Sequence, residues 1–118
     1  MAIQAELQAL CDAYVAAYRA GDTAGCAAVF AEDGAMFSAF APPAIGRAAI
    51  AATHAGWVTG GEGKTLTVRR AAGSGDMAWF LADFAEGEGK GEGISLCVCG
   101  RVPGGPWRIA VSSLTGAG

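Results

Sequence analysis

Three side chains of this sequence have the chemistry for proton transfer: Tyr14, His54 and Asp83. His54 is the one histidine of the chain, and its ordinary pKa of about 6.5 makes both protonation states accessible near neutral pH. It lies on the apolar stripe of a predicted helix, together with Ile50 and Trp57. A packed histidine that hydrogen-bonds the backbone or a neighbour explains this position equally well, so both interpretations stay open.

Asp83 lies in a predicted strand whose same-side neighbours, Trp79 and Leu81, are apolar. A carboxylate among such residues is costly to bury unless it is paired, and burial raises its pKa toward the range that a general acid or base needs. The alternative is a structural aspartate that is bonded to backbone N–H groups or to an arginine such as Arg69 or Arg108.

The elements that position these groups follow from apolar spacing and from the Gly and Pro residues between them. The sequence predicts helices over residues 3–19, 22–30 and 46–57. The predicted strands cover 35–40, 64–72, 77–86, 94–102 and 107–114. Pro42 and Pro43 are expected to end the first strand, and the Gly-rich segment 86–93 to form a solvated hairpin tip. Helices followed by hairpins are typical of an α+β fold.

Both sides of the predicted strand 77–86 are apolar, since Phe80, Ala82 and Phe84 alternate with Trp79 and Leu81. A sheet with one face in water usually alternates apolar with polar residues. We therefore expect one side, which carries Trp79 and Leu81, to meet the helices and a pocket. The side with Phe80, Ala82 and Phe84 is expected to form a homodimer through the sheet face.

The composition narrows the class of protein. A length of 118 residues predicts one domain over 1–118, and 53% hydrophobic residues favour a filled core, a pocket or an interface. A net charge of −3 with no basic stripe argues against nucleic acid as a partner. The chain shows neither an apolar run of about 18 residues nor a signal peptide, so we expect a cytoplasmic protein that does not interact with membranes.

The cysteines do not have the spacing of a metal site. Cys97 and Cys99 lie two apart in a predicted strand, whereas zinc ligands are usually spaced C-x₂₋₄-C with further Cys or His residues. Cys11 and Cys26 lie on apolar helical faces. We predict packed, reduced thiols and no metal, with an intersubunit or adventitious disulfide as the alternative. Nucleotide-binding motifs are also missing, so no cofactor is predicted.

Several phrases of the sequence resemble the ketosteroid-isomerase-like superfamily, also called the nuclear-transport-factor-2-like fold, and its SnoaL-like branch. These phrases are AYVAAYRAGD in the first helix, VFAEDG before the first strand, and GGPWRIAVSSLTG near the end. The resemblance spans nearly the whole chain. It implies a cone in which three N-terminal helices pack on a strongly curved, mainly antiparallel sheet that encloses a pocket.

The resemblance also implies roles for particular residues. Ketosteroid isomerases use a first-strand carboxylate as base, and a helix-one tyrosine and a protonated aspartate as oxyanion donors. Here Tyr14 matches the tyrosine, but Ser38 stands at the base position and Val98 at the aspartate position. His54 stands where those enzymes carry a tyrosine that bonds the oxyanion tyrosine, which implies a Tyr14–His54 hydrogen bond. Steroid isomerisation by that mechanism is therefore not expected.

Together these features predict a protein that binds a small, largely apolar molecule inside the cone. Tyr14, His54 and Asp83 are the candidate catalytic groups of a cofactor-independent isomerase, cyclase or dehydratase. A non-catalytic binder and a dimerisation or association module are the alternatives. The residues expected to line the pocket are Ser38, Phe40, Trp57, Trp79, Leu81, Val98, Val111 and Ser113.

Overall fold

The computed structural model describes residues 2–116 and contains helices on one curved sheet. The helices are α1 (Ala2–Arg19), α2 (Thr23–Ala28), α3 (Arg47–Trp57) and the short 3₁₀ helix η1 (Gly61–Gly63). The strands are β1 (Phe30–Ser38), β2 (Ala41–Ile45), β3 (Thr65–Ser74), β4 (Met77–Ala85), β5 (Glu92–Gly100) and β6 (Arg108–Gly116). They form one sheet in the order β2-β1-β6-β5-β4-β3, in which only β1 and β6 run parallel.

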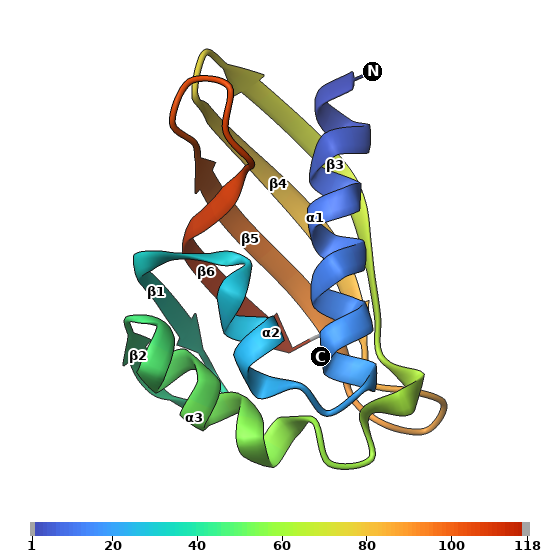
Figure 1. Cartoon of the computed structure of the whole chain (residues 1–118). Coiled ribbons are helices and arrows are strands. Elements are labelled where there is room, and N and C mark those ends of the chain that lie inside the picture. The colour runs from blue at the N-terminus through green and yellow to red at the C-terminus, as the bar shows by residue number, and fades with distance from the viewer. Residues whose placement is uncertain (1, 117–118) are drawn as a thin grey trace.

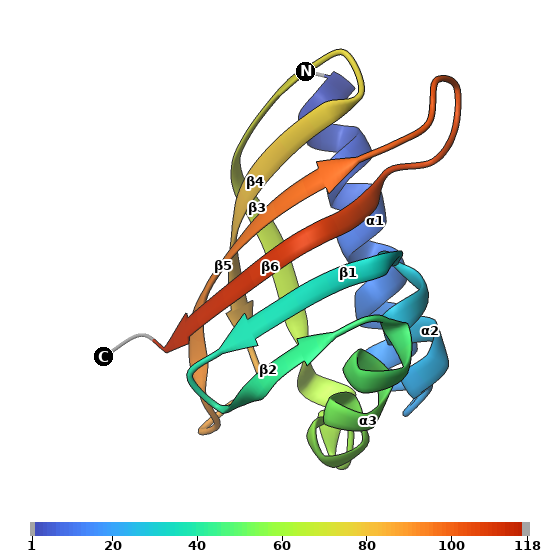
Figure 2. The same cartoon turned by 90° about the vertical axis from the view of Figure 1, so that its left-hand side faces the viewer.

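The helices of the described residues lie together on one face of the sheet. Figure 1 shows α1 running across β3, β4 and β5, with α2 and α3 closing the lower end. Figure 2 shows the sheet curving around these helices, while its other face carries none of them. This is the predicted α+β cone, and its closed interior lies between the helices and the concave face of the sheet. None of the helices in residues 2–116 has the length and apolar character needed to cross a membrane.

The first two helices are fixed by apolar spacing and by their ends. Gly21 takes the positive φ of 72° that turns the chain after α1, a conformation that glycine adopts without strain. The Asp22 carboxylate then accepts a hydrogen bond from the Gly25 N–H at 2.9 Å and caps α2. Apolar side chains at helical spacing bury one stripe of α1 in the core: Leu7, Leu10, Cys11, Tyr14 and Tyr18.

The predicted elements are confirmed, but the start of the sheet is different. Strand β1 begins at Phe30 rather than at residue 35, which shortens the second helix to Thr23–Ala28. Pro42 and Pro43 were expected to end the first strand. Strand β1 instead ends at Ser38, and both prolines belong to strand β2. Strand β2 is at the edge of the sheet, where a proline does not remove a needed ladder hydrogen bond.

The predicted faces of β4 are also wrong. Phe80, Ala82 and Phe84 are buried in the core beneath the helices, whereas Trp79 and Leu81 lie on the outer face. Both groups of side chains are apolar, so the alternation along the strand did not show which group faces the core. An error of one residue in phase exchanges the two faces of a strand. The homodimer expected through the Phe80 side therefore cannot use those residues.

Candidate functional site

The main cavity lies at the end of the cone where α1, α3 and η1 meet the tip between β4 and β5. Its volume is about 350 Å³. A second cavity of about 30 Å³ lies deeper between α1 and the sheet, lined in part by Tyr14. Two residues, Lys64 and Leu114, belong to the walls of both cavities. The wall of the main cavity carries four aromatic side chains, Tyr18, Phe40, Trp57 and Phe84. It also carries the charged residues Lys64, Glu86, Lys90 and Glu92.

The ammonium of Lys64 is the buried charge of this site. The Lys64 side chain is 3% exposed, and its Nζ donates a hydrogen bond to Glu86 Oε2 at 2.6 Å. The same nitrogen lies 4.5 Å from the ring centre of Tyr18 and 4.7 Å from that of Phe84. Aromatic faces attract a cation at such distances, most strongly where water is excluded. Burial lowers the Lys64 pKa below its ordinary value of 10.5, and the Glu86 carboxylate opposes this lowering.

Tyr18 joins this ion pair to the helices. Its hydroxyl donates to Glu86 Oε1 at 2.7 Å and lies 3.1 Å from the Trp57 carbonyl oxygen. Burial is the largest cause that raises the Tyr18 pKa, followed by the hydrogen bond to Glu86. Both oxygens of the Glu86 carboxylate are therefore engaged, one by Tyr18 and the other by Lys64.

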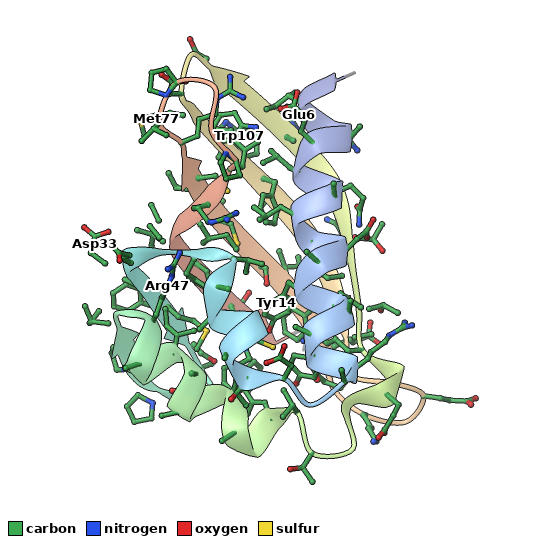
Figure 3. The ribbon with its side chains drawn as sticks, in the orientation of Figure 1. Glu6, Tyr14, Asp33, Arg47, Met77 and Trp107 are labelled. Atoms are coloured by element: carbon green, nitrogen blue, oxygen red, sulfur yellow. The ribbon has the colours of Figure 1, made fainter. Side chains whose placement is uncertain are left out.

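Tyr14 and His54 form a second polar pair inside the cone. The two side chains come from α1 and α3, and Tyr14 Oη lies 2.8 Å from His54 Nε2. Figure 3 shows Tyr14 on the part of α1 that adjoins α2, far from Glu6 and Trp107 near the other end of the helix. The predicted hydrogen bond between Tyr14 and His54 is confirmed.

The direction of this hydrogen bond follows from the other ring nitrogen. His54 Nδ1 lies 2.8 Å from the Ile50 carbonyl oxygen, which only accepts, so Nδ1 carries a proton. Burial lowers the His54 pKa below 6.5, so the ring is neutral at pH 7 and Nε2 accepts the Tyr14 proton. The hydroxyl group of Tyr14 has a single proton, which it donates in the hydrogen bond to His54 Nε2. In this arrangement Tyr14 has no proton to donate to an oxyanion.

Asp83 does not point into either cavity. Its carboxylate lies on the outer face of the sheet, 49% exposed, and is paired with Arg69 at 2.6 Å. The strand register explains this placement, because Asp83 pairs with Thr67 on β3 while the inward residues Ala82 and Phe84 pair with Val68 and Leu66. The prediction that Asp83 joins Tyr14 and His54 is therefore wrong. The structural alternative, a pairing with Arg69, is confirmed.

Comparison with known proteins places this geometry in a family. The model of the SnoaL-like domain matches residues 11–110. The chain belongs to the SnoaL-like domain family. No curated protein sequence matches the chain.

Solved structures agree with this assignment. Rv3472 of Mycobacterium tuberculosis, a protein of unknown function, is 26% identical with a TM-score of 0.81, over 95% of this chain and 70% of the other. A ketosteroid isomerase-like protein from Erwinia carotovora atroseptica is 18% identical with a TM-score of 0.80, over 98% and 96%. An NTF-2 like protein of unknown function from Silicibacter pomeroyi is 17% identical with a TM-score of 0.77, over 96% and 94%. The SnoaL-like branch inferred from the sequence is confirmed, and the likenesses to the ketosteroid isomerase-like and NTF-2 like proteins show the fold.

Within this SnoaL-like domain, two of the expected pocket residues line the main cavity, Phe40 and Trp57. Ser38 lines neither cavity, and its hydroxyl accepts a hydrogen bond from the Phe40 N–H at 2.9 Å. The other expected lining residues share the outer face, because the ladders place them opposite one another: Trp79, Leu81, Val98, Val111 and Ser113.

The sequence did not identify Lys64 and Glu86 as site residues. Glu86 was expected in a solvated tip, but its side chain is only 28% exposed and faces the cavity. The two residues lie 22 positions apart, with no motif between them. The sequence of β4 did contain one physical signal. The charged Asp83 indicates which side of the strand faces water, so Phe84 is on the side that faces the core. Side chains alternate between the two sides, so Glu86, two residues after Phe84, is expected to face inward as well.

The cysteines lie in the core rather than at this site's opening. All four thiols are buried. Burial raises the pKa of Cys11 to about 12, that of Cys26 to about 11 and that of Cys99 to about 12. Thiols with such values are poor nucleophiles and poor metal ligands. Within residues 2–116, no three His, Cys, Asp or Glu side chains lie close enough together to hold a metal ion.

Proposed function

We propose that this SnoaL-like domain binds a small, largely apolar molecule in the main cavity, with a polar oxygen of that molecule held by Lys64. The observation that carries the proposal is the position of the buried Lys64 ammonium beside the aromatic rings of the cavity wall. An ammonium has three N–H donors, and among residues 2–116 Glu86 is the one hydrogen-bond acceptor that Lys64 Nζ contacts. The remaining donors are available to a ligand oxygen.

The dimensions of the cavity support a ligand of modest size. A volume of about 350 Å³ falls at the lower end of small-molecule sites, which span about 300–1,000 Å³. The aromatic wall favours an apolar body through burial of its surface. Any proton-transfer chemistry of the isomerase, cyclase or dehydratase kind would use Lys64 and Glu86, because Asp83 is outside and the Tyr14 proton is engaged.

A fluorescence titration tests this proposal. The probe is 6-propionyl-2-dimethylaminonaphthalene, an apolar ketone whose emission shifts to the blue in a dry site. We expect saturable binding with a blue shift. Thr59→Trp places a bulky ring at an exposed position of the cavity wall and should abolish binding. Thr67→Trp, an exposed position on β3 outside the cavity, is the matched control. No saturable binding by the parent protein, or equal binding by Thr59→Trp, would contradict the proposal.

A role in association is the second candidate function, favoured by the apolar outer face of the sheet. Leu96 and Val111 are 45% and 40% exposed there, beside Trp79, Leu81 and Val98. A second copy of the chain that covers this face would form a homodimer. Leu96→Lys should then give a monomer in sedimentation at micromolar concentration. Val102→Lys, at an exposed valine beyond β5, is the control, and a monomeric parent protein would refute the dimer.

A further inference from the structure

The wall of the main cavity contains an amine that its neighbours hold in one place. The Lys64 side chain is 3% exposed, and Nζ is fixed between Glu86 Oε2 at 2.6 Å and the rings of Tyr18 and Phe84. The backbone of Lys64 is fixed as well, because its carbonyl oxygen accepts a hydrogen bond from Arg19 Nε at 2.8 Å. A molecule that fills the cavity meets this amine in a defined position, which is the condition for an intramolecular-like reaction.

We propose that Lys64 forms an imine with an apolar aldehyde or ketone bound in the main cavity. The inference rests on the proposed function, since the cavity must first bind an apolar molecule. It narrows the ligand class to carbonyl compounds, whose oxygen the Lys64 ammonium can bind before the reaction. Lysine amines in apolar pockets are established nucleophiles of this kind.

Glu86 supplies the proton acceptor that the reaction needs. An ammonium has no lone pair, so Lys64 must first lose a proton, and the carboxylate oxygen at 2.6 Å is placed to take it. Burial helps, because it lowers the Lys64 pKa and makes the neutral amine more accessible at pH 7. Tyr18 keeps the carboxylate in place through its hydrogen bond to Oε1.

The step balances without a further reactant. The neutral amine attacks the carbonyl carbon, a C–N bond forms, and the carbonyl π electrons move to oxygen. That oxygen takes the proton from the protonated Glu86, and the nitrogen, which then carries two protons and a positive charge, loses one of them to the Glu86 carboxylate; this gives a neutral carbinolamine. Glu86 then donates that proton to the hydroxyl group, the nitrogen lone pair forms the C=N bond, and the C–O bond breaks. The products are the protonated imine of Lys64, one water molecule and the Glu86 carboxylate.

Reductive trapping tests the inference on the whole chain. The probe is 2-naphthaldehyde with cyanoborohydride, which converts an imine into a stable secondary amine that peptide mass spectrometry locates. The chain has two lysines, and both line the main cavity. Lys90 is exposed and donates to the Gly60 carbonyl oxygen at 3.0 Å, so it serves within the same sample as the comparison with the buried Lys64. We expect about tenfold or more label on Lys64 relative to Lys90 at pH 7, because the cavity holds the aldehyde beside the fixed Lys64 amine.

Two further measurements distinguish imine formation at Lys64 from binding in the cavity. The fluorescent ketone used above has a weakly electrophilic carbonyl, so its binding reports the cavity alone. An excess of it should protect Lys64 from labelling, and Lys64→Arg should remove the label from position 64. Binding of the fluorescent ketone without preferential labelling of Lys64 would overturn the imine and leave the proposed function standing. If neither binding nor labelling occurs, both are wrong.

Discussion

Replacing Glu86 with glutamine removes the counterion of a buried ammonium and keeps the shape of the side chain. Loss of one partner from a buried ion pair costs about 3–5 kcal/mol of folding stability. This loss has an upper bound, because a Lys64 ammonium without its counterion can release its proton instead of staying charged. The ordinary lysine pKa of 10.5 lies three and a half units above pH 7, and at 1.36 kcal/mol per unit the deprotonation costs about 4.8 kcal/mol. Glu86 is 28% exposed and the amide oxygen still accepts one hydrogen bond, so we expect about 2–4 kcal/mol.

The pH dependence of this loss has a definite sign. The pKa of Lys64 is lowered in the folded protein, so between that pKa and 10.5 the unfolded chain binds more protons. Stability therefore rises with pH across this window. The Glu86 carboxylate raises the folded pKa, and without it the window widens toward lower pH. The stability of Glu86→Gln should rise by up to about 1.4 kcal/mol per pH unit, and its deficit relative to the parent should shrink toward pH 10.5.

Urea unfolding from about pH 6 to pH 10 measures both quantities, provided that the m-value stays unchanged. Glu88→Gln is the matched control, since it removes the same charge from an exposed position of the same hairpin tip. The control should stay within about 0.5 kcal/mol of the parent, as surface substitutions usually do. If Glu86→Gln behaves like Glu88→Gln across the pH range, Lys64 and Glu86 do not form a buried ion pair.

Three further outcomes are expected. Tyr14→Phe leaves the buried His54 Nε2 without its donor and should cost about 1–3 kcal/mol in urea unfolding at pH 7.5, and a neutral result would refute the hydrogen bond. Burial lowers the His54 pKa, so stability should fall as pH drops below 6.5, by up to about 1.4 kcal/mol per unit, and His54→Gln should remove that part of the slope. A thiol reagent should modify none of the cysteines before urea unfolds the chain, and prompt reaction of the folded protein would contradict their burial: Cys11, Cys26, Cys97 and Cys99.

The sequence was sufficient where one local signal dominated. The stripe through Leu7, Tyr14 and Tyr18 defined α1, and the Gly21–Asp22 pair defined its end and the next cap. The Tyr14–His54 hydrogen bond was predictable because both residues occupy positions that the family resemblance placed opposite each other. The pairing of strands could not be predicted in this way, because it joins residues that are distant in the sequence. Strand β2 forms because Ala35 pairs with Ile45 and Met36 with Ala44, and a Pro-Pro sequence carries no signal for that pairing.

The exchange of tyrosine for histidine at position 54 changes more than one contact. A tyrosine at this position could donate its own hydroxyl proton to Tyr14 and leave the Tyr14 proton available. Because His54 Nδ1–H donates a hydrogen bond to the Ile50 carbonyl oxygen, the neutral ring has only Nε2 left as an acceptor, and Tyr14 is the donor of the bond between them. The sequence identified the pair, but the direction of the bond depends on a backbone carbonyl four residues earlier in α3, which only the structure places.

The Lys64–Glu86 pair depends on nearby glycines, and the sequence pattern did not indicate this role. Glycine-rich segments usually indicate mobility, and segments 60–63 and 86–93 both have that composition. In the structure the same glycines permit contact: a Cβ at Gly61 would lie 2.7 Å from the Tyr18 ring, and one at Gly63 would lie 2.8 Å from Gly87 Cα. These close approaches press η1 against α1 and against the tip that carries Glu86. The Lys64–Glu86 pair can therefore form because the neighbouring glycines have no side chains that would keep these segments apart. From composition alone, the same glycines indicate a mobile segment.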